Sequence, residues 1–259
     1  MIDYKLPEEV GIMKRGGKIL SEALWEVLGH AKPGVTELEL DALADRLIRD
    51  KGGEPGFKRV KGWKHAICVS TNDVIVHGVP TNYGFKEGDV VGVDCGVFLD
   101  GFHTDMSETK IVKATTRVVG VPVVGTQTEA FLKIGKRALN EAIKAAKPGN
   151  RIGDISRTIQ DIVEKQGGYS VTRSLIGHGV GRELHEEPEV PGYVVTKREK
   201  TPLLKAGMTI AIEVIYTMGK ADVVLDRDGW TIRTKDGSLA GLYERTVAIT
   251  KDGNIILTP

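Results

Sequence analysis

Two aspartates lie in one segment that predicts a β-hairpin, Gly88–Ile111 (GDVVGVDCGVFLDGFHTDMSETKI). Its valines favour a strand, and Leu99-Asp100-Gly101 supplies the turn. Asp94 and Asp105 fall on either side of this turn, so they should lie opposite or diagonal across the strands, roughly 5 or 7–8 Å apart. Carboxylates that close repel each other unless a proton or a cation lies between them. For this pair alone, a solvent-facing Asp105 and an Asp94 at a bulge would also fit.

Three more ionisable residues lie in apolar or glycine-rich surroundings. Glu213 falls within a predicted strand, Thr209–Tyr216, and Glu244 falls within the last predicted strand, Leu242–Thr250. An acidic residue in an apolar strand needs a partner or a metal. His178 lies in the segment SLIGHGVGRELHEEPEVPGY, whose closely spaced glycines are expected to preclude regular structure and to let the backbone approach a site.

If these five residues converge, they form a site for divalent cations. Four carboxylates and one imidazole carry about −4 and cannot all stay ionised in a dry site. Two divalent ions would neutralise them, and oxygen-rich ligation with one nitrogen suits Mn²⁺, Fe²⁺, Co²⁺ or Zn²⁺. Two such ions, roughly 3.5–4 Å apart, activate a water and stabilise an oxyanion, which is the chemistry of hydrolysis.

Two histidines remain outside this predicted ligand set. His77 and His185 could donate to a substrate carbonyl and to the scissile amide. His77 ends an apolar strand beside a glycine and a proline, so a purely structural role is the alternative for this residue.

The elements around these residues occur twice. Ala31-Lys32-Pro33-Gly34 recurs as residues 146–149, and a glycine pair begins 21 positions after the first alanine of each copy. Asp94 follows Gly88 by six positions, and Glu213 follows Gly207 by six. The matched spacings predict a duplicated α+β unit within one catalytic domain, 1–259, with its chemistry at a pseudo-twofold axis. The halves would span about 12–112 and 130–250, joined by 113–129, with helices expected at 13–29, 36–48, 130–146 and 152–165.

The composition is that of an ordinary soluble globular protein. The chain has 259 residues, of which 41% are hydrophobic and 27% charged, with a net charge of +1. This balance gives no support for a nucleic-acid or membrane partner. Cys68 and Cys95 are too few for a disulfide framework, and no signal peptide or membrane span is evident. We therefore expect a cytoplasmic monomer.

The ordered motifs NDVIVHGVP, VGVDCG, GFHTDMSET, GHGVGRELHEEP, TIAIEV and YERTVAIT resemble those of the type I methionine aminopeptidases, metallopeptidases of family M24 with the pita-bread (creatinase/aminopeptidase) fold. The resemblance runs from about Ile12 to Thr250. It implies an α+β fold with a central antiparallel sheet backed by helices. It also implies an enzyme with two metal ions that removes the initiator methionine from nascent chains when the next residue is small. Ribosome association would suit that role, although no motif here indicates it.

The resemblance also implies a role for each candidate residue. Asp105 and Glu244 would bridge the two ions, and Glu213 would double as the proton shuttle. His77 would assist the amide nitrogen, and His185 would stabilise the carbonyl oxygen. The implied metal ligands are Asp94, Asp105, His178, Glu213 and Glu244, and the implied pocket for the methionine side chain comprises Phe57, Trp63, Cys68, Leu184 and Trp230.

Five positions depart from the family pattern. They are Lys61 and Lys64, where His and Pro are common, Leu184 for an aromatic residue, Val214 for Pro, and Arg245 for His. None is an implied metal ligand, so they bear on specificity and rate.

Two other functions compete with this one. An Xaa-Pro aminopeptidase or prolidase typically carries an extra N-terminal domain, for which the chain has no room. A catalytically inactive binding protein of the same fold would usually have lost metal ligands, and all five are present. The short spacing from His185 to Glu213 and the lack of a zinc-finger extension favour the minimal, bacterial-style type I form.

Overall fold

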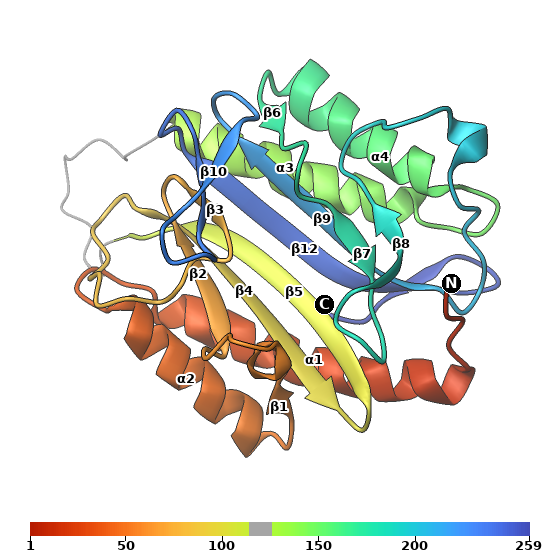
Figure 1. Ribbon diagram of the computed structural model, residues 1–259, viewed down its shortest axis with the longest axis horizontal. Coiled ribbons are helices and arrows are strands. Elements are labelled where there is room, and N and C mark those ends of the chain that lie inside the picture. Colours follow the sequence, from red (N-terminus) through yellow and green to blue (C-terminus); the bar gives the residue numbers. More distant parts are fainter. Residues whose placement is uncertain (114–125) are drawn as a thin grey trace.

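A computed structural model describes residues 1–113 and 126–259. Its main sheet has the strand order β1-β4-β5-β12-β9-β7-β8, and neighbouring strands along this path pair antiparallel. Figure 1 shows β4, β5, β12 and β9 side by side at its centre. The strands on this path are β1 (Glu54–Pro55), β4 (Val90–Leu99), β5 (Phe102–Ile111), β7 (Gly177–Gly179), β8 (Glu186–Val190), β9 (Thr209–Thr217) and β12 (Ala240–Ile249).

Shorter strands extend the sheet at its margins. β2 (Ile67–Thr71) pairs with β4, β6 (Ser170–Val171) with β9, and β13 (Asn254–Ile256) with β12. A separate three-stranded sheet has the order β10-β11-β3, formed by Val223–Leu225, Ile232–Thr234 and Val74–Val76.

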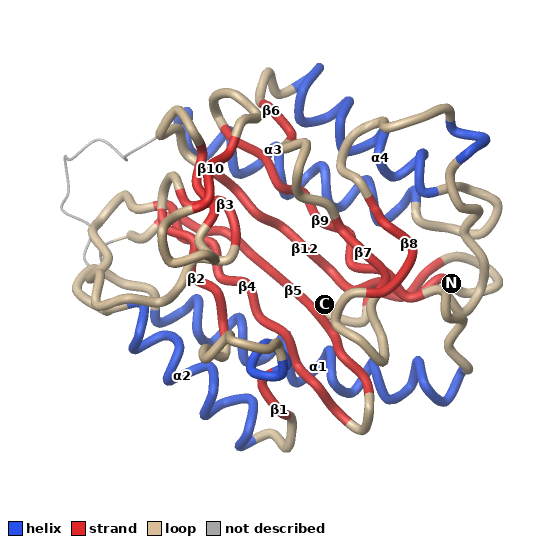
Figure 2. The backbone as a smooth tube through the Cα atoms, in the orientation of Figure 1, coloured by secondary structure: helices blue, strands red, loops and turns tan. Residues whose placement is uncertain are grey.

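In the described part of the chain, four α-helices cover one face of the main sheet (Figure 2). Helices α1 (Pro7–His30) and α2 (Glu37–Asp50) enclose one hydrophobic core with β2 and β4. Helices α3 (Thr126–Ala145) and α4 (Ile152–Gln160) enclose a second core with β9 and β12. Within the described ranges, none of the helices is both long and apolar enough to cross a membrane.

The described residues also form three short helical segments. They are η1 (Gly56–Arg59) and η3 (Arg198–Lys200), both 3₁₀ helices, and η2 (Asp161–Gln166), a π-helical turn that continues α4. The expected α+β fold, a central antiparallel sheet backed by helices, is confirmed.

The β4–β5 hairpin has the predicted turn. Asp100 and Gly101 both adopt left-handed backbone angles, with φ of 47° and 93°. A two-residue hairpin turn with positive φ at both positions matches the twist of the strands, and glycine and aspartate tolerate these angles best. Asp105 pairs with Gly96, and Asp94 pairs with Ser107. The two aspartates are therefore diagonal, one of the two arrangements predicted.

The two copies of the repeated sequence share backbone conformations. Gly34 and Gly149 have φ of 88° and 85°, and Gly88 and Gly207 have φ of 93° and 92°. Two residues after the first pair of glycines, an isolated antiparallel bridge forms in each copy, Thr36 with Gly84 and Arg151 with Leu203. These matches support the division into related halves, which stays a prediction, as does the single catalytic domain.

Two expectations about the chain were wrong. The glycine-rich segment is not irregular, because Gly177–Gly179 forms β7 between β8 and β9. A Cβ at Gly177 would lie 2.4 Å from the Ala211 carbonyl oxygen, so the glycines allow close strand packing. Helix α3 begins at Thr126, inside the expected connection 113–129, and residues 114–125 of that connection lie outside the described ranges.

Candidate metal centre and active site

One row of polar residues crosses the four central strands. Asp94 of β4 pairs with Ser107 of β5, Ser107 with Glu244 of β12, and Glu244 with Glu213 of β9. Residues in register on neighbouring strands project from the same face of a sheet. Strand pairing therefore places three of the predicted carboxylates in one line across the sheet.

A second row lies two residues away on the same face. Asp105 of β5 is held beside Thr246 of β12, whose hydroxyl accepts from the Asp105 N–H at 2.9 Å and donates to the Asp105 carbonyl at 2.8 Å. Thr246 pairs with Ala211 of β9, and Ala211 pairs with His178 of β7. Because side chains alternate between faces with a period of two, Asp105 and His178 project toward the first row.

The structure brings the five predicted ligands together. Atoms of Asp105, His178 and Glu244 all lie within 4.8 Å of one another. His178 Nε2 lies 3.4 Å from Glu213 Oε1. Asp94 lines the same cavity, together with the other four. A largely buried cluster of four carboxylates and one imidazole results.

The electrostatics of this cluster favour a cation. Burial raises the pKa of Asp94 to about 7. Burial, followed by repulsion from neighbouring carboxylates, raises the pKa of Asp105, Glu213 and Glu244 well above the ordinary range. Each shift means that the negative form is unfavourable without a compensating charge. A bound cation would supply that charge.

Unpaired atoms in the cluster fit the same interpretation. Asp94 Oδ1 and Glu244 Oε1 are buried without a hydrogen-bond partner in the described part of the chain. We assign the Nδ1 proton of His178 to a hydrogen bond with the Gly179 carbonyl, 2.8 Å away, which leaves the Nε2 lone pair facing the carboxylates. Burial lowers the pKa of His178 to about 3, so the imidazole is a neutral potential ligand. The residues present therefore fit a metal site.

His77 and His185 line the cavity without belonging to the three-residue ligand cluster. His77 follows β3 with φ of 54°, and this left-handed backbone ends the strand there. The His185 ring lies 4.3 Å from the His178 ring, centroid to centroid. Burial lowers the pKa of both His77 and His185, with a further contribution from His185 at His77. Both rings are thus neutral near pH 7, and each neutral imidazole offers one N–H donor.

The predicted pocket residues also converge. Phe57, Trp63, Cys68 and Leu184 form one buried hydrophobic cluster, against which Trp230 packs. The Trp63 and Trp230 rings meet edge to face, with centroids 5.3 Å apart. These side chains and the acidic cluster line the same cavity of about 120 Å³. An apolar pocket thus adjoins the candidate metal centre.

The five positions that depart from the family pattern have different surroundings. Leu184 lines the pocket, whereas Val214 is buried in the core under α3 and α4. The Arg245 guanidinium donates to Glu108 at 2.6 Å and to the Ser107 carbonyl at 2.9 Å, which ties β12 to β5. Lys61 and Lys64 are exposed.

Two residues near the site were missed in the sequence. Lys5 has a side chain only 1% exposed, and it pairs with Glu186 next to His185. His103 lies two residues before Asp105 and lines a neighbouring cavity. The histidine was visible in the motif GFHTD, but no spacing rule distinguishes it from a core histidine, and nothing in the sequence links Lys5 to Glu186.

Comparison with known proteins gives consistent matches over the whole chain. The model of "Metallopeptidase family M24" matches residues 11–251. A methionine aminopeptidase from Clostridium perfringens is 40% identical over 258 residues, which is all of this chain and 99% of that protein. The crystal structure of methionine aminopeptidase from Thermotoga maritima superposes with a TM-score of 0.92 at 39% identity, covering 100% of this chain and 99% of that one.

A prolidase from Pyrococcus furiosus shares the fold more distantly. It is 25% identical with a TM-score of 0.75, and this chain covers 65% of it. The proline-specific alternative is therefore not favoured, because the chain matches almost the full length of the methionine aminopeptidases and only part of the prolidase.

Proposed function

Because the chain belongs to metallopeptidase family M24 and, within it, to the methionine aminopeptidases, we propose that its acidic cluster holds two divalent ions for peptide hydrolysis. The substrate would be a polypeptide with an N-terminal methionine followed by a small residue. The product pair would be free methionine and the shortened chain. The alternative, a catalytically inactive binding protein of the same fold, is not favoured, because all five predicted metal ligands are present.

Five residues would hold the ions, with Asp105 and Glu244 between them. Their position supports this, because Asp105 and Glu244 lie on the two middle strands, β5 and β12, flanked by Asp94 on β4 and Glu213 on β9. When bound, two divalent ions lower the pKa of water and offset the negative charge that develops on the carbonyl oxygen. The ligands are those predicted from the sequence: Asp94, Asp105, His178, Glu213 and Glu244.

The remaining chemistry falls to three side chains. Glu213 would take a proton from the attacking water and pass it to the leaving amine, a role that its raised pKa supports. His185 would donate to the substrate carbonyl oxygen, and His77 would donate toward the scissile amide nitrogen. Their neutral rings and their places on the cavity wall support these roles.

The apolar pocket would bind the methionine side chain. A thioether is polarisable and gains from contact with aromatic rings, about 0.3–1.5 kcal/mol per contact. Trp63 and Trp230 supply such rings beside Cys68, and all three lie next to the acidic cluster. Binding of the methionine side chain in this pocket would place the first peptide bond beside the carboxylates.

The observation that carries the proposal is the line Asp94–Ser107–Glu244–Glu213 beside Asp105 and His178. The test compares methionine release from Met-Ala-Ser and Met-Leu-Ser by metal-stripped protein, alone and with Mn²⁺, Co²⁺, Fe²⁺ or Zn²⁺. We expect metal-dependent release from Met-Ala-Ser and little from Met-Leu-Ser. Absence of release with every metal, in folded protein that binds the ions, would contradict the proposal.

The setting of the reaction belongs to the same proposal. We expect nascent polypeptides as substrates, in the cytoplasm and near the ribosome, and a chain that acts as a monomer within one catalytic domain. The apolar pocket and the peptide chemistry support the class of substrate, whereas the compartment and the ribosome follow only from the role.

A further inference from the structure

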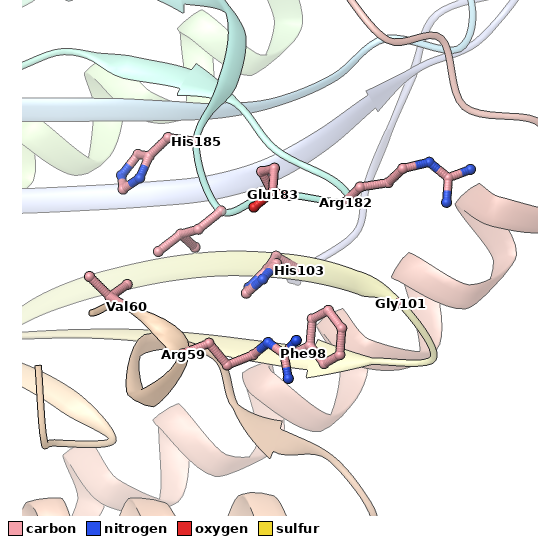
Figure 3. A pocket seen from close by; sticks show the side chains of 9 residues that line it. Arg59, Val60, Phe98, Gly101, His103, Arg182, Glu183 and His185 are labelled. Carbon is pink, nitrogen blue, oxygen red and sulfur yellow. The ribbon is translucent and has the colours of Figure 1, made fainter. Parts of the chain in front are cut away.

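A second cavity, of about 600 Å³, adjoins the catalytic cavity. The two share Val60, Leu184 and His185 as lining residues. Figure 3 shows its walls: the segment with Arg59 and Val60 on one side, and the loop with Arg182, Glu183 and His185 on the other. We name this cavity the exit groove. A third cavity, of about 290 Å³ beside Asp73 and Asp226, shares no lining residue with the catalytic cavity.

His103 lies in the wall of the exit groove formed by the β4–β5 hairpin (Figure 3). The residue is 5% exposed, and its ring centroid lies 4.8 Å from that of Phe98. The Arg59 guanidinium lies over the Phe98 ring, with its carbon 3.8 Å from the ring centroid. The His103 backbone N–H donates to the Gly181 carbonyl at 2.6 Å, which joins this wall to the loop opposite. The ring is therefore held in place from two sides.

The two ring nitrogens of His103 have different surroundings. Nδ1 is buried without a hydrogen-bond partner, and a Cβ built on Gly56 would lie 3.2 Å from it. A buried acceptor without a partner is tolerated better than a buried N–H without one. We therefore assign the proton to Nε2, which makes no hydrogen bond within residues 1–113 and 126–259 and is left as a donor for the groove.

We propose that the exit groove binds the substrate polypeptide beyond its second residue and that His103 Nε2 donates to a main-chain carbonyl there. This rests on the proposed function and extends it. Before the first residue is cleaved off, the rest of the substrate chain extends from the scissile bond, beside His185. An extended chain advances roughly 3.3–3.5 Å per residue, so the third and fourth residues must leave the catalytic cavity within two steps. His185 lines both cavities and connects them.

The chemistry of the groove suits this occupant. A main-chain carbonyl is an acceptor that every polypeptide offers, whatever its sequence. A single donor in a fixed position can therefore hold many different substrates in register. His103 is thus a positioning residue: it contacts the polypeptide away from the bond that breaks.

The test uses the full-length, metal-loaded protein and two substrates, Met-Ala amide and Met-Ala-Ser-Ala-Ser amide. One additional neutral hydrogen bond to the substrate corresponds to roughly a 2- to 10-fold gain in kcat/KM. We expect the wild-type protein to favour the pentapeptide in kcat/KM by about that factor. In His103→Phe, which keeps a ring against Phe98, the ratio of the two kcat/KM values should fall to about 1. In His103→Gln, which keeps a donor, the preference should be largely retained.

The control is His30→Phe, because His30 is an exposed histidine at the end of α1. This variant should keep the wild-type ratio. An equal loss of both activities in His103→Phe, or a wild-type ratio near 1, would overturn the inference while leaving the proposed function intact. Failure of the wild-type protein to cleave either substrate would overturn the proposed function and, with it, this extension.

As a second readout, the product Ala-Ser-Ala-Ser amide should inhibit the wild-type protein about 2- to 10-fold more strongly than His103→Phe. Equal inhibition of the two proteins would contradict a role of His103 in binding the chain.

Discussion

Glu213 and Glu244 face each other directly across β9 and β12, in register and on the same face of the sheet. Like charges in this position destabilise a strand pair. Here burial, followed by repulsion from Asp105 and then from Glu213, raises the pKa of Glu244. A fold that places two carboxylates in this relationship, with Asp105 on the next strand, is organised for cation binding.

Replacing Glu244 with glutamine tests that relationship. Excess Mn²⁺ at 100 times its dissociation constant should stabilise the wild-type protein by about 2.7 kcal/mol. Glu244→Gln should lose most of this stabilisation and lose methionine release by more than about 100-fold, since even a partner that only supports a ligand is worth roughly 10–100-fold. Thermal unfolding with and without metal measures the first effect.

The control for that substitution is Glu189→Gln, because Glu189 is an exposed residue of β8. This variant should keep the metal stabilisation and the methionine release of the wild-type protein. Full metal stabilisation in Glu244→Gln would show that Glu244 is not a ligand.

Relative to Asp94→Asn, the metal-free wild-type protein should lose stability between pH 6.5 and pH 8. Unfolded aspartate, with a pKa near 3.9, is ionised throughout this range. Folded Asp94, with a pKa of about 7, still binds a proton at the lower end and loses it at the upper end. Protonation therefore stabilises the folded state at pH 6.5, and this contribution, about 1 kcal/mol from Asp94 alone, is lost as pH rises.

Unfolded histidine has a pKa near 6.5, so His178, whose folded pKa is lowered, also contributes in this window. The Asp94 contribution is therefore taken as the difference between the wild-type protein and Asp94→Asn, in which the histidine contributions cancel. Urea unfolding at intervals of pH, with a chelator present, gives the curve. Excess metal should flatten it. If the free energy of unfolding of the chelated wild-type protein, minus that of Asp94→Asn, rises from pH 6.5 to pH 8, the linkage is contradicted.

Removing the imidazole at position 185 should separate catalysis from metal binding. Loss of one donor to a developing oxyanion costs roughly 10²–10³-fold in kcat. We expect His185→Ala to lose activity by about that factor while still binding the ions, because His185 lies outside the cluster of Asp105, His178 and Glu244. Calorimetric metal titration measures metal binding and steady-state kinetics measures catalysis, so together they distinguish the two effects. Parallel loss of metal and activity would make His185 a ligand instead.

Lys5 anchors the loop that carries His185. Its side chain is 1% exposed and pairs with Glu186, which also accepts from the Glu183 N–H at 3.1 Å. Removing one partner of a buried ion pair leaves the other charge uncompensated and costs about 3–5 kcal/mol. Lys5→Met should therefore lower the free energy of unfolding by about that amount and reduce kcat/KM, with metal affinity retained.

Chemical denaturation measures the stability of the Lys5 variant. Lys14→Met, at an exposed lysine of α1, is the matched control and should leave stability nearly unchanged. The double variant Lys5→Met/Glu186→Gln should recover part of the loss, because no buried unpaired charge remains and Asp3, the second partner of Lys5, is exposed to solvent. Equal stability of Lys5→Met and the wild-type protein would show that the ion pair is not needed.

The local pattern was enough to predict the hairpin and its two aspartates. The predicted turn placed Asp94 and Asp105 opposite or diagonal across the hairpin, and the observed register shows that they are diagonal. Glu213 and Glu244 could be identified as unusual in apolar strands. That they face each other depends on β9 pairing with β12, which the order of elements does not determine.

Long-range contacts explain what the sequence did not reveal. Lys5 and Glu186 are 181 positions apart and meet only after both halves have folded. The glycines of β7 suggested an irregular segment, because glycine weakens a strand. Their actual role, allowing the Ala211 carbonyl to approach closely, requires knowledge of the neighbouring strand.

The most direct test of the metal-centre assignment is a titration of metal-stripped protein with Mn²⁺, following bound ions per chain and methionine release from Met-Ala-Ser together. We expect release to rise from background as the acidic cluster fills, and we expect two ions per chain to be bound at saturation. Saturation of folded protein with no release of methionine would contradict the assignment of this cluster as a catalytic metal centre.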